Sequence, residues 1–146
     1  MRHHLVLRVV AKLLIPYILI FGLYVQFHGD FGPGGGFQAG VIFASAFVLY
    51  ALIYGVERAR QVIPDDVLRV GIGMGVLIFG LAGVESMVLD ANYLDYSPFG
   101  SDSASGQHIG ILVVEFGVGV TVASVMATLF LLFAGRGGEH DPTEEE

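Results

Sequence analysis

The sequence contains no cysteine and no tryptophan, and one lysine among its 146 residues. The absence of cysteine excludes disulfides, thiolate catalysis and cysteine metal sites. With one lysine and no basic patch interleaved with aromatic residues, the chain lacks the electrostatic footprint of a nucleic-acid-binding protein. The sequence also shows no nucleophile–base pair and no cluster of metal ligands, so we expect neither an enzyme nor a bound cofactor.

Charge is scarce as well. Only 14% of the residues are charged, whereas soluble domains typically carry about 25%. Hydrophobic residues make up 54% of the chain, and the mean hydropathy is +0.71. A chain of this length cannot bury so much apolar surface in its own core, so the composition predicts a protein of the lipid bilayer.

Apolar residues gather in four long stretches, each close to or above the ~20 residues that cross a bilayer as a helix. None shows the period-two alternation of a barrel strand, so each is predicted to be a helix. We therefore expect an all-α integral membrane protein, with one transmembrane domain over residues 1–135 and a disordered acidic tail over 136–146. The expected helices cover about 5–27, 37–54, 67–89 and 108–133.

The basic residues predict how the helices are oriented. With four spans, all seven basic residues fall on one side of the membrane, and the two connections on the other side carry none. The positive-inside rule then places both termini in the cytoplasm. The seven residues are Arg2, Arg8, Lys12, Arg58, Arg60, Arg69 and Arg136.

A glycine-rich turn, HGDFGPGGG over residues 28–36, separates the first two expected helices. Pro33 cannot continue a helix, and Gly34, Gly35 and Gly36 let two helix ends approach closely. One interpretation is a tight hairpin and nothing more. The other is that the successive glycine N–H groups at a helix start bind an anion or a carboxylate.

Three ionisable residues lie inside or beside the expected helices and are the candidates for an ion path. A charge in hydrocarbon is costly, so Glu85 and Glu115 are expected to face the interior of a helix bundle, a partner or a water path. Counted from the expected helix ends, both lie roughly 8–10 Å below the outer surface. His108 is two turns from Glu115 on the same face. The alternatives are carboxyls bonded to a neighbour's backbone and an ordinary interfacial histidine.

These residues offer oxygen ligands but no metal cluster. A transient sodium ion near Glu115 or Glu85 is compatible with them, provided that backbone carbonyls or a partner supply further oxygens. Small residues at helical spacing, such as Gly71 with Gly75 and Gly40 with Ala44, predict close helix packing, either within the chain or against other subunits.

The block PGGGFQAG and the segment GILVVEFGVGVTVASVM resemble the MnhB-domain family, whose members are membrane subunits of the Mrp-type multisubunit sodium/proton antiporters. The resemblance covers nearly all of residues 5–135. It departs from the family pattern upstream of the block, where HGD stands in place of GH, so no role is carried over to His28. The matching positions are Pro33, Gly34, Gly35, Gly36, Phe37, Gln38 and Gly40.

This resemblance implies an accessory multi-pass subunit of a bacterial or archaeal cell membrane, in a complex that exchanges cytoplasmic sodium for external protons. Its implied partners are the other membrane subunits, the lipid bilayer, sodium ions and protons. Two alternatives stay open. One is a small four-helix proton-coupled exporter that acts as a homodimer, and the other is a purely structural scaffold of a related hydrogenase-type complex.

Overall fold

The computed structural model describes residues 2–29 and 32–136. In this part of the chain the regular structure is entirely helical. The helices are α1 (Arg2–His28), α2 (Gly36–Tyr54), α3 (Val56–Val62), α4 (Asp65–Val88), the 3-10 turn η1 (Ser97–Phe99) and α5 (Ser103–Arg136). Four of them are long and apolar enough to cross a membrane, which confirms the predicted all-α membrane fold. The predicted disorder of the tail concerns residues that lie, from 137 onward, outside the described part.

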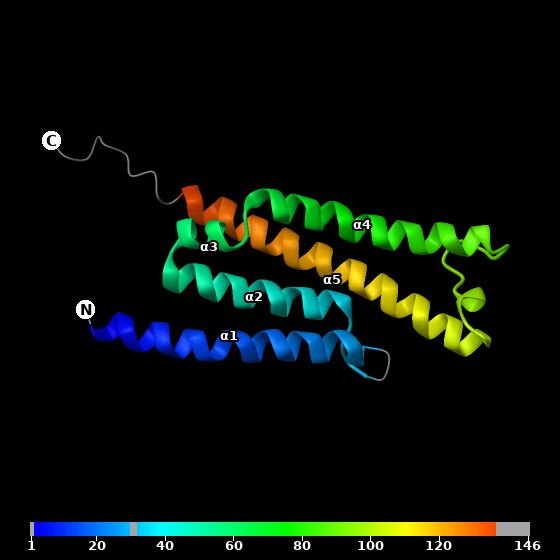
Figure 1. Ribbon diagram of the computed structural model, residues 1–146, viewed down its shortest axis with the longest axis horizontal. Helices are drawn as coiled ribbons and strands as arrows, with labels where there is room; N and C mark the ends of the chain where they lie inside the picture. The colour runs from blue at the N-terminus through cyan, green and yellow to red at the C-terminus, as the bar shows by residue number, and fades with distance from the viewer. Residues whose placement is uncertain (1, 30–31, 137–146) are drawn as a thin grey trace.

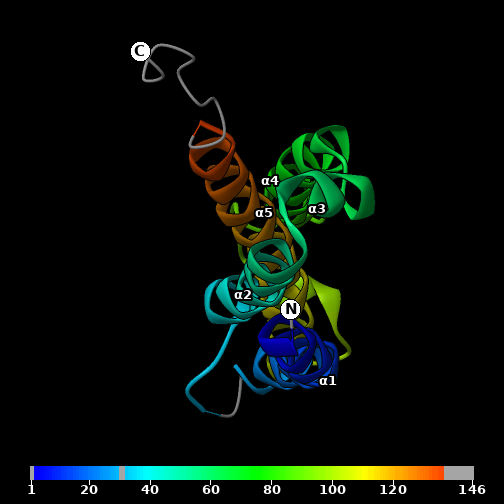
Figure 2. The ribbon, with the colours of Figure 1, turned by 90° about the vertical axis from the view of Figure 1, so that its left-hand side faces the viewer.

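The four long helices form an open row in the order α1, α2, α5, α4 (Figures 1 and 2). α5 packs on both α2 and α4, and α1 packs mainly on α2. Because the row does not close into a bundle, its end helices keep much of their surface free. In the most apolar stretch of α1, 11% of the residues are buried, against 39% in α2.

Glycines and other small residues form the contacts of α5 with its two neighbours. A methyl group on Gly75 of α4 would lie 2.5 Å from the carbonyl oxygen of Gly117. A methyl group on Gly40 of α2 would lie 2.7 Å from the carbonyl oxygen of Gly119. Glycine costs a helix about 1 kcal/mol relative to alanine, and in lipid the close approach that it permits drives association. The predicted small-residue packing therefore operates within this chain.

Two features differ from the expected helix pattern. The short helix α3 was not expected, and its Ala59 is fully buried against α2, α4 and α5. The last helix, α5, begins at Ser103 rather than at residue 108, because Asp102 caps it. Asp102 Oδ2 accepts a hydrogen bond from Ser105 N at 3.4 Å, and Asp102 Oδ1 accepts one from Ser105 Oγ at 2.6 Å. Aspartate is a preferred residue at this position, since it satisfies free backbone donors.

The two ends of the molecule are unlike. We call the end with α3, the start of α1 and the end of α5 the basic end, and the opposite end the turn end. At the turn end, the α1–α2 connection stops well short of the α4–α5 connection along the long axis (Figure 1). The glycine turn therefore lies beside the body of α5 and not beside its first turn.

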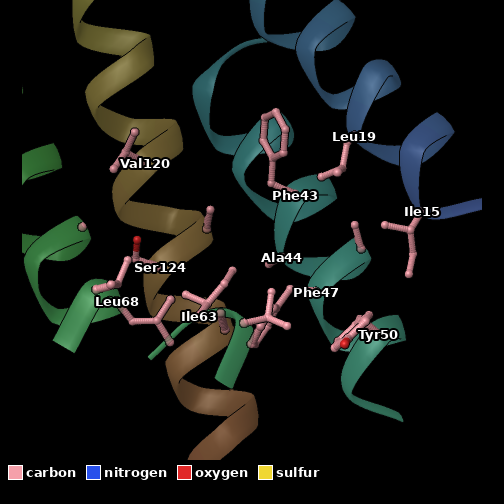
Figure 3. A pocket seen from close by; sticks show the side chains of 16 residues that line it. Ile15, Leu19, Phe43, Ala44, Phe47, Tyr50, Ile63, Leu68, Val120 and Ser124 are labelled. Carbon is pink, nitrogen blue, oxygen red and sulfur yellow. The ribbon is translucent and has the colours of Figure 1, made fainter. Parts of the chain in front are cut away.

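A groove of about 470 Å³ runs along one face of the row near the basic end. Its walls come from Ile15 and Leu19 of α1, from α2, from α5 and from Leu68 at the start of α4 (Figure 3). The lining is apolar apart from Ser124 and the Tyr50 hydroxyl. Such a surface suits hydrocarbon and offers an ion two hydroxyls but no charged group, so the candidate site must be sought elsewhere.

Candidate functional site

The glycine turn closes the end of α1 and starts α2 with backbone hydrogen bonds. Gly32 N donates to the carbonyl oxygen of His28 at 3.1 Å, and Gly35 N donates to that of Val25 at 3.2 Å. These bonds satisfy carbonyls that the last turn of a helix leaves free. Gly35 has φ of 119° and precedes the first residue of α2. That conformation is strained for any residue with a side chain.

The turn leaves no room for side chains on its glycines. A methyl group on Gly29 would lie 2.7 Å from Gly35 Cα, and one on Gly34 would lie 2.7 Å from the carbonyl oxygen of Val25. A methyl group on Gly36 would collide with the carbonyl oxygen of Glu115. Backbone therefore packs directly on backbone, both within the turn and between α2 and α5.

The side chain of Glu115 reaches into this turn from α5. Its Oε1 lies 2.9 Å from the positions that methyl groups on Gly29 and Gly35 would occupy. Its Oε2 is buried and has no hydrogen-bond partner among the residues that the structure describes. The carboxyl also lies beside the N-terminus of α2, where the helix dipole favours negative charge. The Glu115 carboxyl of the same chain is thus a close neighbour of the glycine turn.

The magnitudes show that the dipole alone does not stabilise an ionised Glu115. A charged residue at the centre of a membrane helix costs about 2.5–3.5 kcal/mol on insertion scales. The N-terminus of a helix stabilises a nearby negative charge by about 0.3–1 kcal/mol, and by at most about 2 kcal/mol. The remainder has to come from a proton, a cation, water or a hydrogen-bond donor at the orphaned Oε2.

Gln26 of α1 is a site residue that the sequence analysis missed. Its side chain is 5% exposed, and its Oε1 lies 2.7 Å from where a methyl group on Gly119 would be. Its Nε2 is buried and finds no hydrogen-bond acceptor within the described residues. A glutamine near the end of an apolar helix resembles an interfacial residue in the sequence, and only its burial distinguishes it.

Glu85 and His108 lie nearer the turn end than Glu115 does. α4 and α5 are antiparallel, with Gly75 facing Gly117. Glu85 is then roughly 15 Å beyond this crossing, whereas Glu115 is roughly 3 Å beyond it. The expectation of equal depth was wrong, because it counted from helix ends that do not lie at one level. Glu85 is exposed, and His108 is half-buried roughly 10 Å from Glu115 along α5.

The residues of the predicted turn motif differ in burial. Gly35, Gly36 and Gly40 are buried and Gly34 is half-buried, whereas Pro33, Phe37 and Gln38 are exposed. Phe37 is 62% exposed and, at the first turn of α2, faces away from the row. Its large apolar surface is available to lipid or to a neighbouring subunit.

Comparison with known proteins identifies the family. Residues 6–128 match the family model described as a domain related to the MnhB subunit of the Na+/H+ antiporter. The chain belongs to this MnhB family. The match includes the glycine turn, Gln26 and Glu115.

Curated relatives match over a similar range. In Staphylococcus aureus strains Newman and USA300, the protein named "Putative antiporter subunit mnhB2" is 35% identical over 133 residues. The match covers 89% of this MnhB-family chain and 94% of the relative. The similarity therefore extends over all four spanning helices and is not confined to the glycine turn.

The second connection at the turn end of this MnhB-family chain, residues 89–102, holds a carboxylate of a different kind. Asp95 Oδ1 accepts hydrogen bonds from Ser97 Oγ at 2.7 Å, from Ser97 N at 3.1 Å and from Gln107 Nε2 at 3.3 Å. These donors, the Ser97 hydroxyl first, lower the pKa of Asp95 below its ordinary value. Asp95 is thus a satisfied structural carboxylate, in contrast to Glu115.

Proposed function

We propose that the chain is an accessory integral subunit of a multisubunit Na+/H+ antiporter in a bacterial or archaeal cell membrane. The observation that supports this most strongly is the family match over residues 6–128, together with relatives of nearly the same extent that are named as antiporter subunits. In such a complex, other chains carry the main proton-pumping machinery, and this chain adds helices and a site of its own.

The open row of helices supports a place among other subunits. Within the described residues, both faces of the row and most of α1 are left without neighbouring helices. The alternative of an independent exporter requires a carboxylate at the centre of a closed bundle, and an open row does not provide one. The relatives likewise do not favour that exporter or a scaffold of a hydrogenase-type complex, since they are named as antiporter subunits.

We further propose that Glu115 contributes its carboxyl to the cation or proton path of the complex. The orphaned Oε2 supports this, because a buried carboxyl atom without a partner costs free energy unless something binds it. Glu85 and His108, nearer the turn end, are the proposed approach to that site from the adjacent aqueous side.

The experiment replaces Glu115 by Gln in the complete complex. We expect normal assembly but at least a roughly tenfold loss of sodium/proton exchange in membrane vesicles, because the charge is removed while size and hydrogen bonding are kept. Glu115→Asp should retain part of the activity, and Glu85→Gln should be milder. The matched control is Glu57→Gln, which removes an exposed carboxylate at the basic end. Normal exchange by an assembled Glu115→Gln complex at every pH would leave this carboxyl with a structural role.

The orientation is also a proposal: the basic end lies in the cytoplasm and the turn end outside. The chain has no cysteine, so single cysteines can be introduced cleanly at exposed Ser101 and Arg58. An impermeant thiol reagent added to intact cells should label Ser101→Cys and not Arg58→Cys. Labelling of Arg58→Cys and not of Ser101→Cys would show that the basic end lies outside and that the proposed orientation is wrong.

A further inference from the structure

We propose that Gln26 and Glu115 together form a binding site for one small monovalent cation within this chain, in which the Gln26 amide is the ligand that responds to the cation. This inference rests on the proposed role of Glu115 and adds to it a second residue and a ligand chemistry.

Two facing pairs of residues place the two side chains at adjoining levels of the contact between α1 and α5. Glu115 reaches from α5 to Gly29 at the end of α1, and Gln26 reaches from α1 to Gly119 of α5. Gln26 lies in the last turn of α1 and Gly29 directly follows that helix, three residues on. Glu115 and Gly119 are four residues apart on α5 and share one face of it. The two polar side chains therefore cross the same α1–α5 gap about 6 Å apart along the axis.

The burial of their polar atoms leaves one group on each of the two side chains unpaired within the described residues. Glu115 Oε2 and Gln26 Nε2 are both buried, and neither has a partner in the part of the chain that the structure describes. Buried polar atoms are nearly always hydrogen-bonded in folded proteins. Two orphans of opposite kind, an acceptor and a donor, on facing helices point to a shared ligand or to a water-filled site between them.

A monovalent cation fits the charges and the ligand atoms. One carboxylate carries one negative charge, which one sodium ion neutralises, and the cost of a bare charge in hydrocarbon is then removed. Hard cations prefer carboxylate and amide carbonyl oxygens. The Gln26 amide offers its NH2 group to a bare carboxylate and, turned by half a rotation, its carbonyl oxygen to a cation.

The surroundings leave room for such a rotation. Gln26 lines a cavity of about 320 Å³ together with Gly119, Phe27 and Phe116. Ser124 is the other polar side chain in this lining. Glu115 is not part of this lining, and its carboxyl lies against Gly29 and Gly35 of the turn. One ligand is thus fixed and the other is adjustable.

The test compares Gln26→Met with the matched control Gln61→Met, an exposed glutamine of α3, in the complete complex. We expect Gln26→Met to raise the apparent KM for sodium roughly tenfold with a maximal rate within about twofold, since one ligand to a charged species is lost. Gln61→Met should behave as the unmodified chain. Gln26→Glu, which keeps two oxygens and the size, should bind sodium at least as well as the unmodified chain.

A second measurement does not depend on the Gln26 variants assembling. A sodium-minus-potassium infrared difference spectrum of the purified complex should contain a carboxylate band that Glu115→Gln removes. If Glu115→Gln impairs exchange but Gln26→Met and Gln26→Glu leave the KM for sodium unchanged, the cation site is wrong and the proposed function stands. If Glu115→Gln alters neither exchange nor the spectrum, the role of Glu115 and the site are both wrong.

Discussion

Two connections lie toward the turn end of the molecule, and they are stabilised by opposite means. The glycine turn is stabilised by close backbone packing. Its glycines carry no side chains, so their backbone can pack on other backbone and on Glu115. The 89–102 loop is held by side chains, with Asp95 as acceptor for Ser97 and Gln107. Glu115 packs against the turn and Asp95 lies in the loop. Of these two carboxylates, Asp95 has hydrogen-bond donors among the described residues, whereas Glu115 Oε2 has none there.

This difference separates a structural acid from a candidate functional one. Asp95 accepts two hydrogen bonds from Ser97, two residues away, and a third from Gln107 in the first turns of α5. Glu115 is brought to the turn only by helix packing, and one of its oxygens stays without a partner in the described structure. A carboxyl group whose charged form the fold does not fully stabilise can bind and release protons or cations, which makes Glu115 the functional candidate of the two.

The largest expected effect comes from filling the contact between the turn and α5. Gly36→Ala should reduce the amount of chain recovered in the purified complex more than tenfold, because its methyl group would collide with the backbone of Glu115, and backbone cannot move aside cheaply. Gly73→Ala is the control, since nothing lies within 4 Å of a methyl group there. Equal recovery of both variants would show that the backbone contact is dispensable.

A second pair of variants separates backbone strain from crowding. Gly35 and Gly55 combine φ of 119° and 94° with extended ψ of 177° and 152°, a region that essentially only glycine adopts, so alanine is strained at both by about 1–3 kcal/mol. Only Gly35 faces Glu115, whereas a methyl group on Gly55 would meet nothing within 4 Å. Gly35→Ala should therefore lower thermal stability and complex recovery clearly more than Gly55→Ala.

The bulkier Gly35→Val should impair assembly more than it alters sodium affinity. A complex that assembles normally with Gly35→Val, and differs only in its affinity for sodium, would mean that the turn itself is a ligand site. In that case the contrast between a packing turn and a hydrogen-bonded loop would fail.

The smallest effect is expected in the 89–102 loop. Because the folded pKa of Asp95 is lowered, its contribution to loop stability is present above the ordinary Asp pKa of about 3.9. It is lost as pH falls through the lowered value. Asp95→Asn should speed amide hydrogen exchange in the loop a few-fold at pH 7, with assembly unchanged.

The control for the loop is Asp90→Asn, at an exposed position with φ of 61°, where asparagine is tolerated. It should leave hydrogen exchange nearly unchanged. If Asp95→Asn abolished assembly, the loop would be as critical as the glycine turn, and the ranking of the two connections would be reversed.

Part of the site was predictable because its signals are local. Glu115 stands out as a charge within an apolar helix, and the PGGG run stands out as a helix break. The start of α5 was missed although Asp102, followed by serines, is a local capping signal. Gln26 had no signal at all, since a glutamine near a helix end is ordinary until its burial is known.

The sequence by itself determined the four spanning helices, the break between the first two, and the separation of basic residues from the turn end. Each of these follows from composition and spacing within one segment. Only the tertiary structure decided that the row is open, that Glu85 lies away from Glu115, that Glu115 reaches the glycine turn, and that Gln26 is buried against Gly119. The physical reason is that the relative positions of the helices along their axes, and the faces by which they touch, depend on how closely two backbones approach. In lipid this approach is set by pairs of small residues on different helices, which lie far apart in the chain.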